Sequence, residues 1–243
     1  MSVHEVAKAG TSIWLDDLSR AKITGLDAHS LPSRIEHSGV VGVTTNPSIF
    51  SAAISGAAEY AADIAAMKGS TVDDVVKKLT TDDVRQACDL FAPIFSNSKG
   101  FDGRVSIEVD PRLARDTENT IIQGRALWKI VNRPNLLIKV PATIEGLPAI
   151  TALIADGISV NVTIIFSVDR YKAVLEAFMA GLELRLSHGN SITEIHSVAS
   201  FFISRVDSEV DAQLKALGTE AATALLGKTA IANARLAYQE FKT

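Results

Sequence analysis

One apolar run of the chain carries a lysine at a position where a buried strand usually has none. Residues 135–143 read Asn-Leu-Leu-Ile-Lys-Val-Pro-Ala-Thr, so apolar residues flank Lys139 on both sides. A short, continuous apolar run is typical of a strand covered on both faces, as in the parallel sheets of α/β proteins. The run therefore predicts an α/β fold in which Lys139 lies on a buried strand.

A lysine on such a strand has two interpretations. In the first, desolvation disfavours the ammonium form, so an amine held there can be a neutral nucleophile near pH 7 and form a Schiff base with a carbonyl substrate. In the second, the lysine stands at a strand end and extends its ammonium into solvent along an apolar stem. Taken alone, the run favours the second interpretation, and other parts of the chain must decide.

The rest of the chain alternates apolar, β-branched runs with helical patterns. This alternation predicts parallel βαβ units, and its repetition predicts a (β/α)8 TIM-barrel type fold. About six of the eight units are found, so we expect residues 1–243 to form a single (β/α) barrel domain that is truncated at its C-terminal end. Expected N-caps are Ser70 or Thr71, Thr81 and Ser167. The predicted strands are 12–18, 39–46, 103–110, 135–143, 158–166 and 195–202, and the predicted helices are 2–10, 19–26, 48–67, 72–79, 82–95, 112–131, 144–155, 168–186, 206–217 and 220–241.

Composition and charge exclude several classes of partner. The 243 residues have a net charge of -4, and aromatic residues make up only 6%. A nucleic-acid-binding surface needs clustered cations or stacking rings, and the chain has no basic run, so no nucleic acid partner is expected. No apolar run approaches the roughly 20 residues of a membrane span, and the N-terminus has no secretory signal. We therefore expect a cytoplasmic protein with no membrane partner.

The single cysteine and the scattered histidines argue against further chemistry. Cys88 lies in a helical pattern, so it forms no intramolecular disulfide and is interpreted as a core thiol rather than a nucleophile. The histidines lack metal-ligand spacing, and no glycine-rich phosphate loop follows any predicted strand. We therefore expect neither a metal nor a cofactor. The histidines are His4, His29, His37, His188 and His196.

Polar residues recur at the C-terminal ends of the predicted strands. In (β/α) barrels that end carries the chemistry, so the recurrence means more than any one residue. Taken singly, each has an ordinary interpretation: Asp16 caps a helix, Asn46 forms a turn before a proline, and Thr163 is a common strand residue. Because Asn161 and Thr163 stand two apart in a strand, they are expected to point to the same side. The polar positions are Asp16, 44–46, Glu108, Lys139, Asn161, Thr163 and Ser200.

Several segments of the chain together resemble the transaldolase family, in its larger bacterial type. The resemblance runs from about residue 12 to the end of the chain, and the T-T-N-P-S and I-K-V-P-A-T blocks are specific in combination. It implies transfer of a dihydroxyacetone unit from a ketose phosphate, such as sedoheptulose 7-phosphate or fructose 6-phosphate, to an aldose phosphate in the pentose phosphate pathway. The reaction would pass through a lysine Schiff base and need no cofactor. The segments are 43–48, 107–110, 137–143, 161–163 and 200–205.

The resemblance also implies a role for each matching residue. Lys139 would form the Schiff base, and Asp16 would act as the acid and base during carbon–carbon cleavage. Asp17 is less suited, since it would face the other side of its strand. Glu108 and Thr163 would position and activate the water of the carbinolamine steps. The substrate-binding residues would be Thr44, Asn46 and Asn161 for the dihydroxyacetone unit, Ser200 for its first hydroxyl, and Arg205 for the sugar phosphate.

The chain departs from the family after Arg205. Similar members continue through a seventh and an eighth strand and have a second serine and arginine for the phosphate, whereas Arg235 lies in an Ala-rich helix and is interpreted as a surface residue. We therefore expect a truncated chain whose own activity is open. The alternatives to a transaldolase are an aldolase that releases the three-carbon unit, and a catalytically silent partial barrel that acts only through association with another chain. Sugar phosphates are the expected substrates, and a homo-oligomer is left open.

Overall fold

The computed structural model describes residues 3–243, without the side chain of His4, and the chain divides into two compact units. The boundary falls inside the strand that carries Lys139, which is the last residue of unit 1. The prediction of a single barrel domain stays a prediction. Unit 1 comprises Met1–Pro111, of which residues 3–111 are described, and Ile122–Lys139. Unit 2 comprises Arg112–Ile121 and Val140–Thr243.

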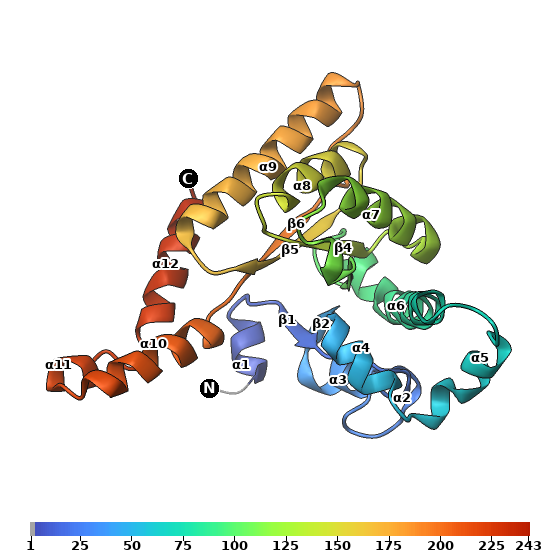
Figure 1. The fold of residues 1–243 in the computed structure, drawn as a ribbon, viewed down its shortest axis with the longest axis horizontal. Helices are drawn as coiled ribbons and strands as arrows, with labels where there is room; N and C mark the ends of the chain where they lie inside the picture. Colours follow the sequence, from blue (N-terminus) through green and yellow to red (C-terminus); the bar gives the residue numbers. More distant parts are fainter. Residues whose placement is uncertain (1–2) are drawn as a thin grey trace. The chain divides into compact units, whose positions relative to one another are not determined.

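Unit 1 contains parallel strands whose order follows the order of the chain. The pairing places polar residues at matching levels: Asp16 lies opposite Thr44, and Glu108 lies opposite Lys139. Every residue of the strand that carries Lys139 is buried, as the apolar run predicted. The strands are β1 (Ile13–Asp16), β2 (Val40–Thr44), β3 (Arg104–Glu108) and β4 (Leu136–Pro141), with the last two residues of β4 in unit 2 (Figure 1).

The helices of unit 1 largely follow the predicted order. Residues 48–67 were predicted as one helix, which is wrong: they are split because Gly56 has a positive φ of 74°. The segment 31–38, for which no helix was predicted, forms one between the N-cap Ser30 and Gly39 in the left-handed conformation. The elements are α1 (Val3–Lys8), α2 (Arg20–Thr24), α3 (Leu31–Ser38), α4 (Pro47–Ile54), the 3-10 turn η1 (Ala58–Tyr60), α5 (Ala61–Ala66) and α6 (Val72–Asn97).

The helix α6 replaces the two helices predicted at 72–79 and 82–95. It is one continuous helix, and Thr71 is its N-cap, as predicted. Thr81 is not an N-cap: its hydroxyl donates to the carbonyl of Lys77 at 2.7 Å inside the helix. A threonine that bonds back to the preceding turn satisfies its own hydroxyl without ending the helix. The chain therefore keeps the long, half-buried helix beside β3.

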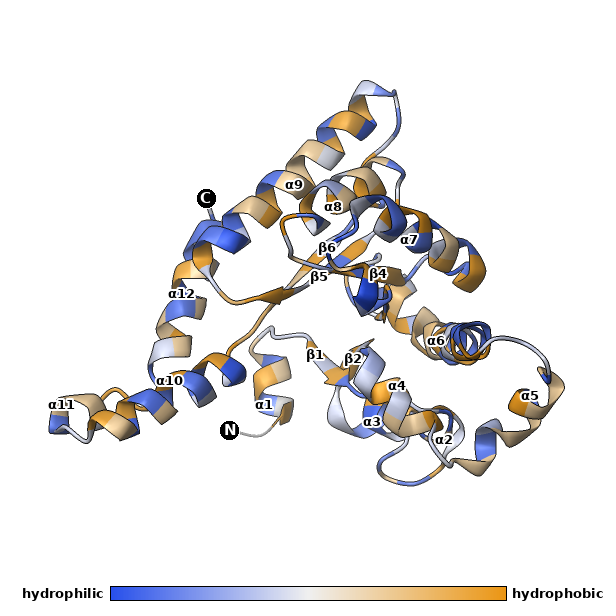
Figure 2. Cartoon of the chain, viewed as in Figure 1, coloured by the Kyte–Doolittle hydropathy of each residue, from blue (hydrophilic) through white to orange (hydrophobic). Residues whose placement is uncertain are grey.

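Unit 2 contains the end of β4, then β5 (Val160–Ile165) and β6 (Ser197–Phe201), which pair in parallel. Its helices α8 (Gly146–Ala155) and α9 (Val168–Ser187) pack closely, because Gly181 lies against Ile154 with no room for a side chain between them. Figure 2 colours β5 and β6 mainly as hydrophobic, whereas much of α10 (Ser204–Leu217) is hydrophilic. The strands β5 and β6 are thus more hydrophobic than the exposed helix α10.

Two further predicted helices, those at 112–131 and 220–241, differ from the helices in the structure. The helix predicted at 112–131 begins later, as α7 (Thr117–Val131), after the 3-10 turn η2 (Pro111–Leu113). The helix predicted at 220–241 is two helices, α11 (Glu220–Thr223) and α12 (Thr229–Phe241), because Gly227 has a φ of 67° between them. Ser167 is the N-cap of α9, as predicted.

The fold class is confirmed by these elements. The described part of the chain has six strands alternating with helices, and the strand pairs recorded in each unit are parallel. This is an α/β fold consistent with a partial (β/α)8 barrel of about six units. No helix among residues 3–243 combines the length and apolar character that crossing a membrane requires.

Candidate active site

Lys139 is buried and bonded inside unit 1, so its amine does not extend into solvent. Only 6% of the residue is exposed. Its Nζ donates to the carbonyl of Thr45 at 2.9 Å and lies 3.3 Å from Oε2 of Glu108. The alternative of a strand-end lysine with a solvated ammonium is therefore wrong. What remains is an amine in the interior with one carbonyl and one carboxylate as its recorded partners.

The pairing of β3 with β4 explains why Glu108 and Lys139 meet. The two residues are direct partners in parallel strands, and Val109 continues the ladder by donating its backbone N–H to the carbonyl of Lys139 at 3.1 Å. Residues at paired positions of neighbouring strands present their side chains on the same face of a sheet. The register of β3 against β4 therefore brings the two charged side chains together, and neither residue lies on a loop.

Glu108 is placed to exchange a proton with the amine. Burial raises the pKa of the Glu108 carboxyl, the neighbouring Lys139 ammonium lowers it, and the Asp16 carboxylate raises it again, with a net increase above the usual value. A carboxyl with a raised pKa holds a proton more readily near neutral pH than a solvated glutamate does. The Glu108 carboxylate could therefore accept a proton from the Lys139 amine and return it.

The segment that follows β2 brings two predicted residues to unit 1. Oγ1 of Thr44 is buried and has no hydrogen-bond partner among the described residues. Asn46 is the N-cap of α4, since its Oδ1 accepts from the N–H of Ile49 at 3.0 Å. Asn46 thus has a structural role as a helix cap, whereas the sequence suggested a turn. The cap uses the oxygen of the amide and leaves its NH2 group as a donor for a hydroxyl.

Asp16 and Asp17 differ in their surroundings. Asp16 is the last residue of β1, is exposed, and is near enough to Glu108 to raise the pKa of that carboxyl. Asp17 forms an ion pair with Lys22 in α2. Asp17 is therefore engaged in a local contact, whereas Asp16 belongs to the charged group around Lys139.

The sequence predicted no individual role for Thr45, which belongs to the polar run 44–46 after β2. Thr45 is fully buried, its carbonyl accepts from Nζ of Lys139, and its hydroxyl donates to the carbonyl of Ser106 at 2.8 Å. A contact made by a backbone carbonyl leaves no trace in the choice of side chain. Only the position of Thr45 between Thr44 and Asn46 could have drawn attention to it.

In unit 2 the structure joins two of the predicted residues directly. Asn161 is buried, and its Oδ1 accepts a hydrogen bond from Oγ of Ser200 at 2.8 Å. Thr163 is also buried, and its carbonyl accepts from the N–H of Ala142 at 2.9 Å. This hydrogen bond between β5 and β6 orients the amide of Asn161, because it fixes the position of Oδ1.

Thr163 lies next to an irregularity in β5. The pairing of β5 with β6 shifts between Val162 and Ile165, and Ile164 has a positive φ of 57°. A β-branched residue rarely adopts this conformation, and bulges of this kind redirect side chains and are frequent beside active sites. The strain supports a functional role for this end of β5.

Arg205 is exposed near the start of α10. Its guanidinium carbon lies 4.8 Å from the centre of the Phe202 ring, and that ring stacks on Phe166 at 5.1 Å. Stacking on an aromatic ring leaves the N–H donors at the edge of the guanidinium free to point elsewhere. Arg235 is exposed on α12, as the sequence predicted.

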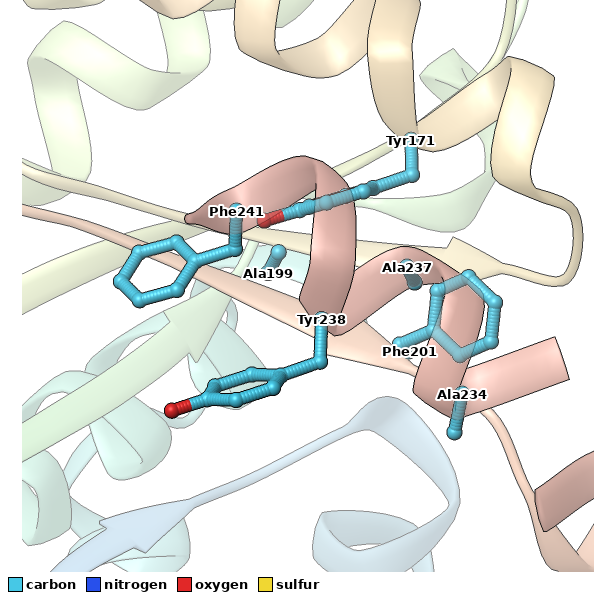
Figure 3. A pocket seen from close by; sticks show the side chains of 7 residues that line it. All are labelled: Tyr171, Ala199, Phe201, Ala234, Ala237, Tyr238 and Phe241. Atoms are coloured by element: carbon cyan, nitrogen blue, oxygen red, sulfur yellow. The ribbon is translucent and has the colours of Figure 1, made fainter. Parts of the chain in front are cut away.

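One pocket in unit 2 does not match the predicted chemistry, and the described residues form no candidate metal site. A pocket in unit 2 is lined by aromatic and alanine side chains whose only polar groups are two tyrosine hydroxyls (Figure 3), and it contains none of the predicted site residues. Such a lining offers a sugar phosphate few hydrogen bonds. Among residues 3–243, no group of three or more histidine, cysteine, aspartate or glutamate side chains could hold a metal ion. The lining residues are Tyr171, Ala199, Phe201, Ala234, Ala237, Tyr238 and Phe241.

A family model and the similar curated proteins all indicate the same family. Residues 13–243 match the model of the family described as Transaldolase/Fructose-6-phosphate aldolase. Proteins named Transaldolase from Arthrobacter sp. (strain FB24), Mycolicibacterium smegmatis and Thermobifida fusca are 58%, 56% and 52% identical to this chain. The alignments cover 98%, 98% and 99% of the chain, but 64%, 64% and 65% of the relatives. The chain thus spans slightly less than two thirds of the length of these curated relatives.

Proposed function

This chain belongs to the transaldolase/fructose-6-phosphate aldolase family, and we propose that it transfers a dihydroxyacetone unit between a ketose phosphate and an aldose phosphate through a Schiff base on Lys139. The observation that carries the proposal is the buried Nζ of Lys139, 3.3 Å from the carboxylate of Glu108. An interior amine beside a carboxyl of raised pKa is what carbinolamine chemistry needs. The matching relatives are named Transaldolase, which favours transfer over simple release of the three-carbon unit.

The first step of the proposed reaction joins Lys139 to the ketose. The ammonium gives a proton to Glu108, and the neutral amine attacks the carbonyl carbon at C2 of the ketose phosphate. The carbinolamine then loses its hydroxyl as water, and Glu108 and Thr163 supply and receive the protons through that water. The product is an iminium that withdraws electrons from the bond between C3 and C4. Its raised pKa and its distance of 3.3 Å from the amine support Glu108 as the acid and base of this step.

The second step cleaves the carbon–carbon bond. Asp16 takes the proton from the C4 hydroxyl, the C3–C4 bond breaks, and its electrons pass into the iminium to give an enamine on Lys139. The shortened aldose phosphate leaves, and an acceptor aldose phosphate takes its place. The enamine carbon then attacks the acceptor aldehyde while Asp16 returns the proton, and hydrolysis frees the lengthened ketose phosphate. Asp16 is suited to this role as an exposed carboxylate beside the Glu108 and Lys139 pair.

The remaining polar residues are proposed to bind the substrate. Thr44 offers a buried hydroxyl with no recorded partner, and Asn46 offers the NH2 group that its capping bond leaves over. In unit 2, Ser200 and Asn161 form a bonded pair that would receive the first hydroxyls of the dihydroxyacetone unit. Arg205 would bind the phosphate with its planar guanidinium, which suits two parallel hydrogen bonds to phosphate oxygens. A phosphate and several hydroxyls are therefore the expected recognition features of the substrate.

A coupled transfer assay tests this proposal. The chain is incubated with fructose 6-phosphate and erythrose 4-phosphate, and sedoheptulose 7-phosphate and glyceraldehyde 3-phosphate are measured together. We expect equal amounts of both products, and no product from a Lys139→Met variant. Glyceraldehyde 3-phosphate with free dihydroxyacetone would indicate the aldolase reaction instead. If neither product forms, the proposal fails for this chain, and the alternative of a catalytically silent partial barrel gains support.

The setting of the reaction is part of the proposal. We expect sugar phosphates as the substrates, the pentose phosphate pathway as the context, and the cytoplasm as the location. The low aromatic content and net charge of -4 support the absence of a nucleic acid partner. A homo-oligomer stays a prediction for size-exclusion chromatography with light scattering to decide.

A further inference from the structure

We propose that Thr45 is a positioning residue: its backbone carbonyl holds Nζ of Lys139 in the reactive orientation, and its hydroxyl fixes that carbonyl in place. The inference rests on the function proposed above, because it assigns a part of the same site. It concerns a residue that touches the amine only through its main chain. All the contacts that carry it lie within unit 1.

Thr45 is held by two hydrogen bonds, one made by its backbone carbonyl and one by its side-chain hydroxyl. The residue is 0% exposed. Its carbonyl accepts a hydrogen bond from Nζ of Lys139 at 2.9 Å, and its Oγ1 donates to the carbonyl of Ser106 at 2.8 Å. Ser106 lies two residues before Glu108 on β3 and is also fully buried. One residue thus links the amine on β4 to the strand that carries its carboxylate.

The hydroxyl of Thr45 acts where the recorded backbone pairing of its strand has ended. The paired residues of β2 and β3 are Gly42 with Arg104 and Val43 with Val105. Thr45 lies beyond β2, and its side chain makes the next recorded connection to β3. Without that bond, the segment between β2 and α4 would lose its tie to β3 at the level of the amine. The position of the carbonyl therefore depends on the Thr45 side chain.

A carbonyl is suited to hold a nitrogen throughout the proposed reaction. It accepts a hydrogen bond from the ammonium, from the neutral amine and from a protonated iminium, since each of these carries at least one N–H. It neither gives nor takes a proton. Thr45 therefore orients the nitrogen without setting its proton transfer, which is the part proposed for Glu108. Loss of this positioning should lower the rate of adduct formation but leave its pH midpoint unchanged.

Three variants separate positioning from packing. Thr45→Val keeps the shape of the side chain and removes the hydroxyl, whereas Thr45→Ser keeps the hydroxyl and removes a methyl group. The matched control is Thr81→Val, because Thr81 is also fully buried and its hydroxyl also donates to a carbonyl, that of Lys77 at 2.7 Å. If Thr45→Val does not fold, Thr45→Ala replaces it as the variant without a hydroxyl.

The first measurement needs no substrate. Proteins labelled with ¹⁵N at lysine Nζ are studied by NMR, and hydrogen exchange of the Lys139 ammonium, assigned with Lys139→Met, is measured in each variant. We expect exchange at least fivefold faster in Thr45→Val than in the wild type, and wild-type exchange in Thr45→Ser and Thr81→Val. Unchanged exchange in Thr45→Val would overturn the inference even if the chain proves inactive. A failed transfer assay, in contrast, overturns the proposed function and leaves this result standing.

The second measurement links the position of the amine to its reaction. Single-turnover trapping with fructose 6-phosphate and borohydride gives the rate of adduct formation on Lys139 at several pH values. Misplacement of a reacting group by about 1 Å costs on the order of 100-fold in rate, so we expect a 10- to 100-fold loss in Thr45→Val with an unchanged pH midpoint and an unchanged substrate concentration at half-maximal rate. Recovery in Thr45→Ser supports the inference. A loss of equal size in Thr45→Ser would instead assign the effect to the methyl group and overturn it.

Discussion

Two charge clusters of unit 1, each with a buried member, differ in how completely their polar atoms are bonded. The first joins Arg20 to Asp83, and the second joins Lys139 to Glu108. Burial raises the pKa of both carboxyls, those of Asp83 and of Glu108. Burial alone therefore does not distinguish a structural pair from a reactive one, and the difference must lie in the contacts around each pair.

The cluster around Arg20 is densely bonded. The guanidinium reaches Asp83 from Nε at 3.0 Å, forms an ion pair with Asp63, and lies 4.6 Å from the centre of the Tyr60 ring. The hydroxyl of Tyr60 donates to Asp83 at 2.7 Å and accepts from the backbone N–H of Arg20 at 2.9 Å. Each group has several partners that hold it in one geometry. Such a cluster stabilises a fold, and its charges are not free to react.

The cluster around Lys139 is sparse by comparison. The recorded partners of Nζ are one carbonyl and one carboxylate oxygen, whereas an ammonium has three N–H donors. The buried hydroxyl of Thr44, from the neighbouring segment, has no recorded partner. Incomplete bonding in the interior is costly, and it is tolerated at sites that bind a further group. The two clusters therefore differ in their unsatisfied donors, and the pair proposed as reactive is the one with donors still to satisfy.

Replacing Lys139 is expected to have the largest effect on activity. Lys139→Met should abolish adduct formation entirely while lowering the free energy of unfolding by no more than about 2 kcal/mol, because Met fills the space and Glu108 can become neutral. Without the ammonium, the pKa of Glu108 rises further above its unfolded value. The variant should therefore lose stability relative to the wild type as the pH rises above the pKa of an unfolded glutamate, because the folded variant holds the Glu108 proton to higher pH. Denaturant unfolding over a pH series, with mass spectrometry of trapped adduct, checks both parts.

A substitution in the other cluster should show the opposite pattern. Asp83→Asn removes the buried charge that faces Arg20, so we expect a loss of about 3 kcal/mol in the free energy of unfolding. The rate of adduct formation per folded molecule should stay within twofold of the wild type. Denaturant unfolding and burst-phase trapping measure the two quantities. A large loss of rate in a fully folded sample would contradict the division between a structural and a reactive cluster.

Glu108→Gln sharpens the comparison within the reactive cluster. Gln cannot exchange a proton with the amine, so the carbinolamine steps should slow by about 100-fold, the lower range for loss of a general acid and base. The binding of fructose 6-phosphate should change little, and any change of rate with pH that comes from titration of the Glu108 carboxyl should disappear. Stopped-flow measurement of iminium formation over a pH series gives these values. An unchanged rate would exclude Glu108 from proton transfer.

Tyr60→Phe is expected to have the smallest effect. It removes one hydroxyl that serves both Asp83 and the N–H of Arg20. The remaining bonds keep the cluster together, so the free energy of unfolding should fall by about 1–2 kcal/mol with no change in the rate of adduct formation. Thermal and denaturant unfolding detect this loss. A loss as large as that of Asp83→Asn would show that the hydroxyl holds the whole cluster.

The sequence predicted the fold class because its strands are apolar runs separated by helices. It also predicted that Lys139 lies on a buried strand, and the structure removed the solvated alternative by burying the amine against Glu108. It failed for elements that depend on context. Thr81 has the side chain of an N-cap, yet inside α6 it bonds to the preceding turn.

Contacts made by the backbone explain the rest of what the sequence could not show. The meeting of Glu108 with Lys139 follows from strand register, which no spacing along the chain reveals. Thr45 reaches the amine through its carbonyl, so any residue type could make that contact in principle. Its hydroxyl bond to Ser106 joins positions 61 residues apart in the chain. Long-range contacts made by the main chain are therefore the part of this site that the sequence does not predict.

Trapping of the covalent intermediate is the strongest test that Lys139 is the reactive amine. The chain is incubated with fructose 6-phosphate, reduced with borohydride, and studied by intact mass followed by peptide mapping. We expect one three-carbon adduct per chain, located on Lys139, and no adduct on any other lysine. A chain of unchanged mass after reduction, or an adduct on a different lysine, would contradict the claim that the buried amine beside Glu108 is the reactive group.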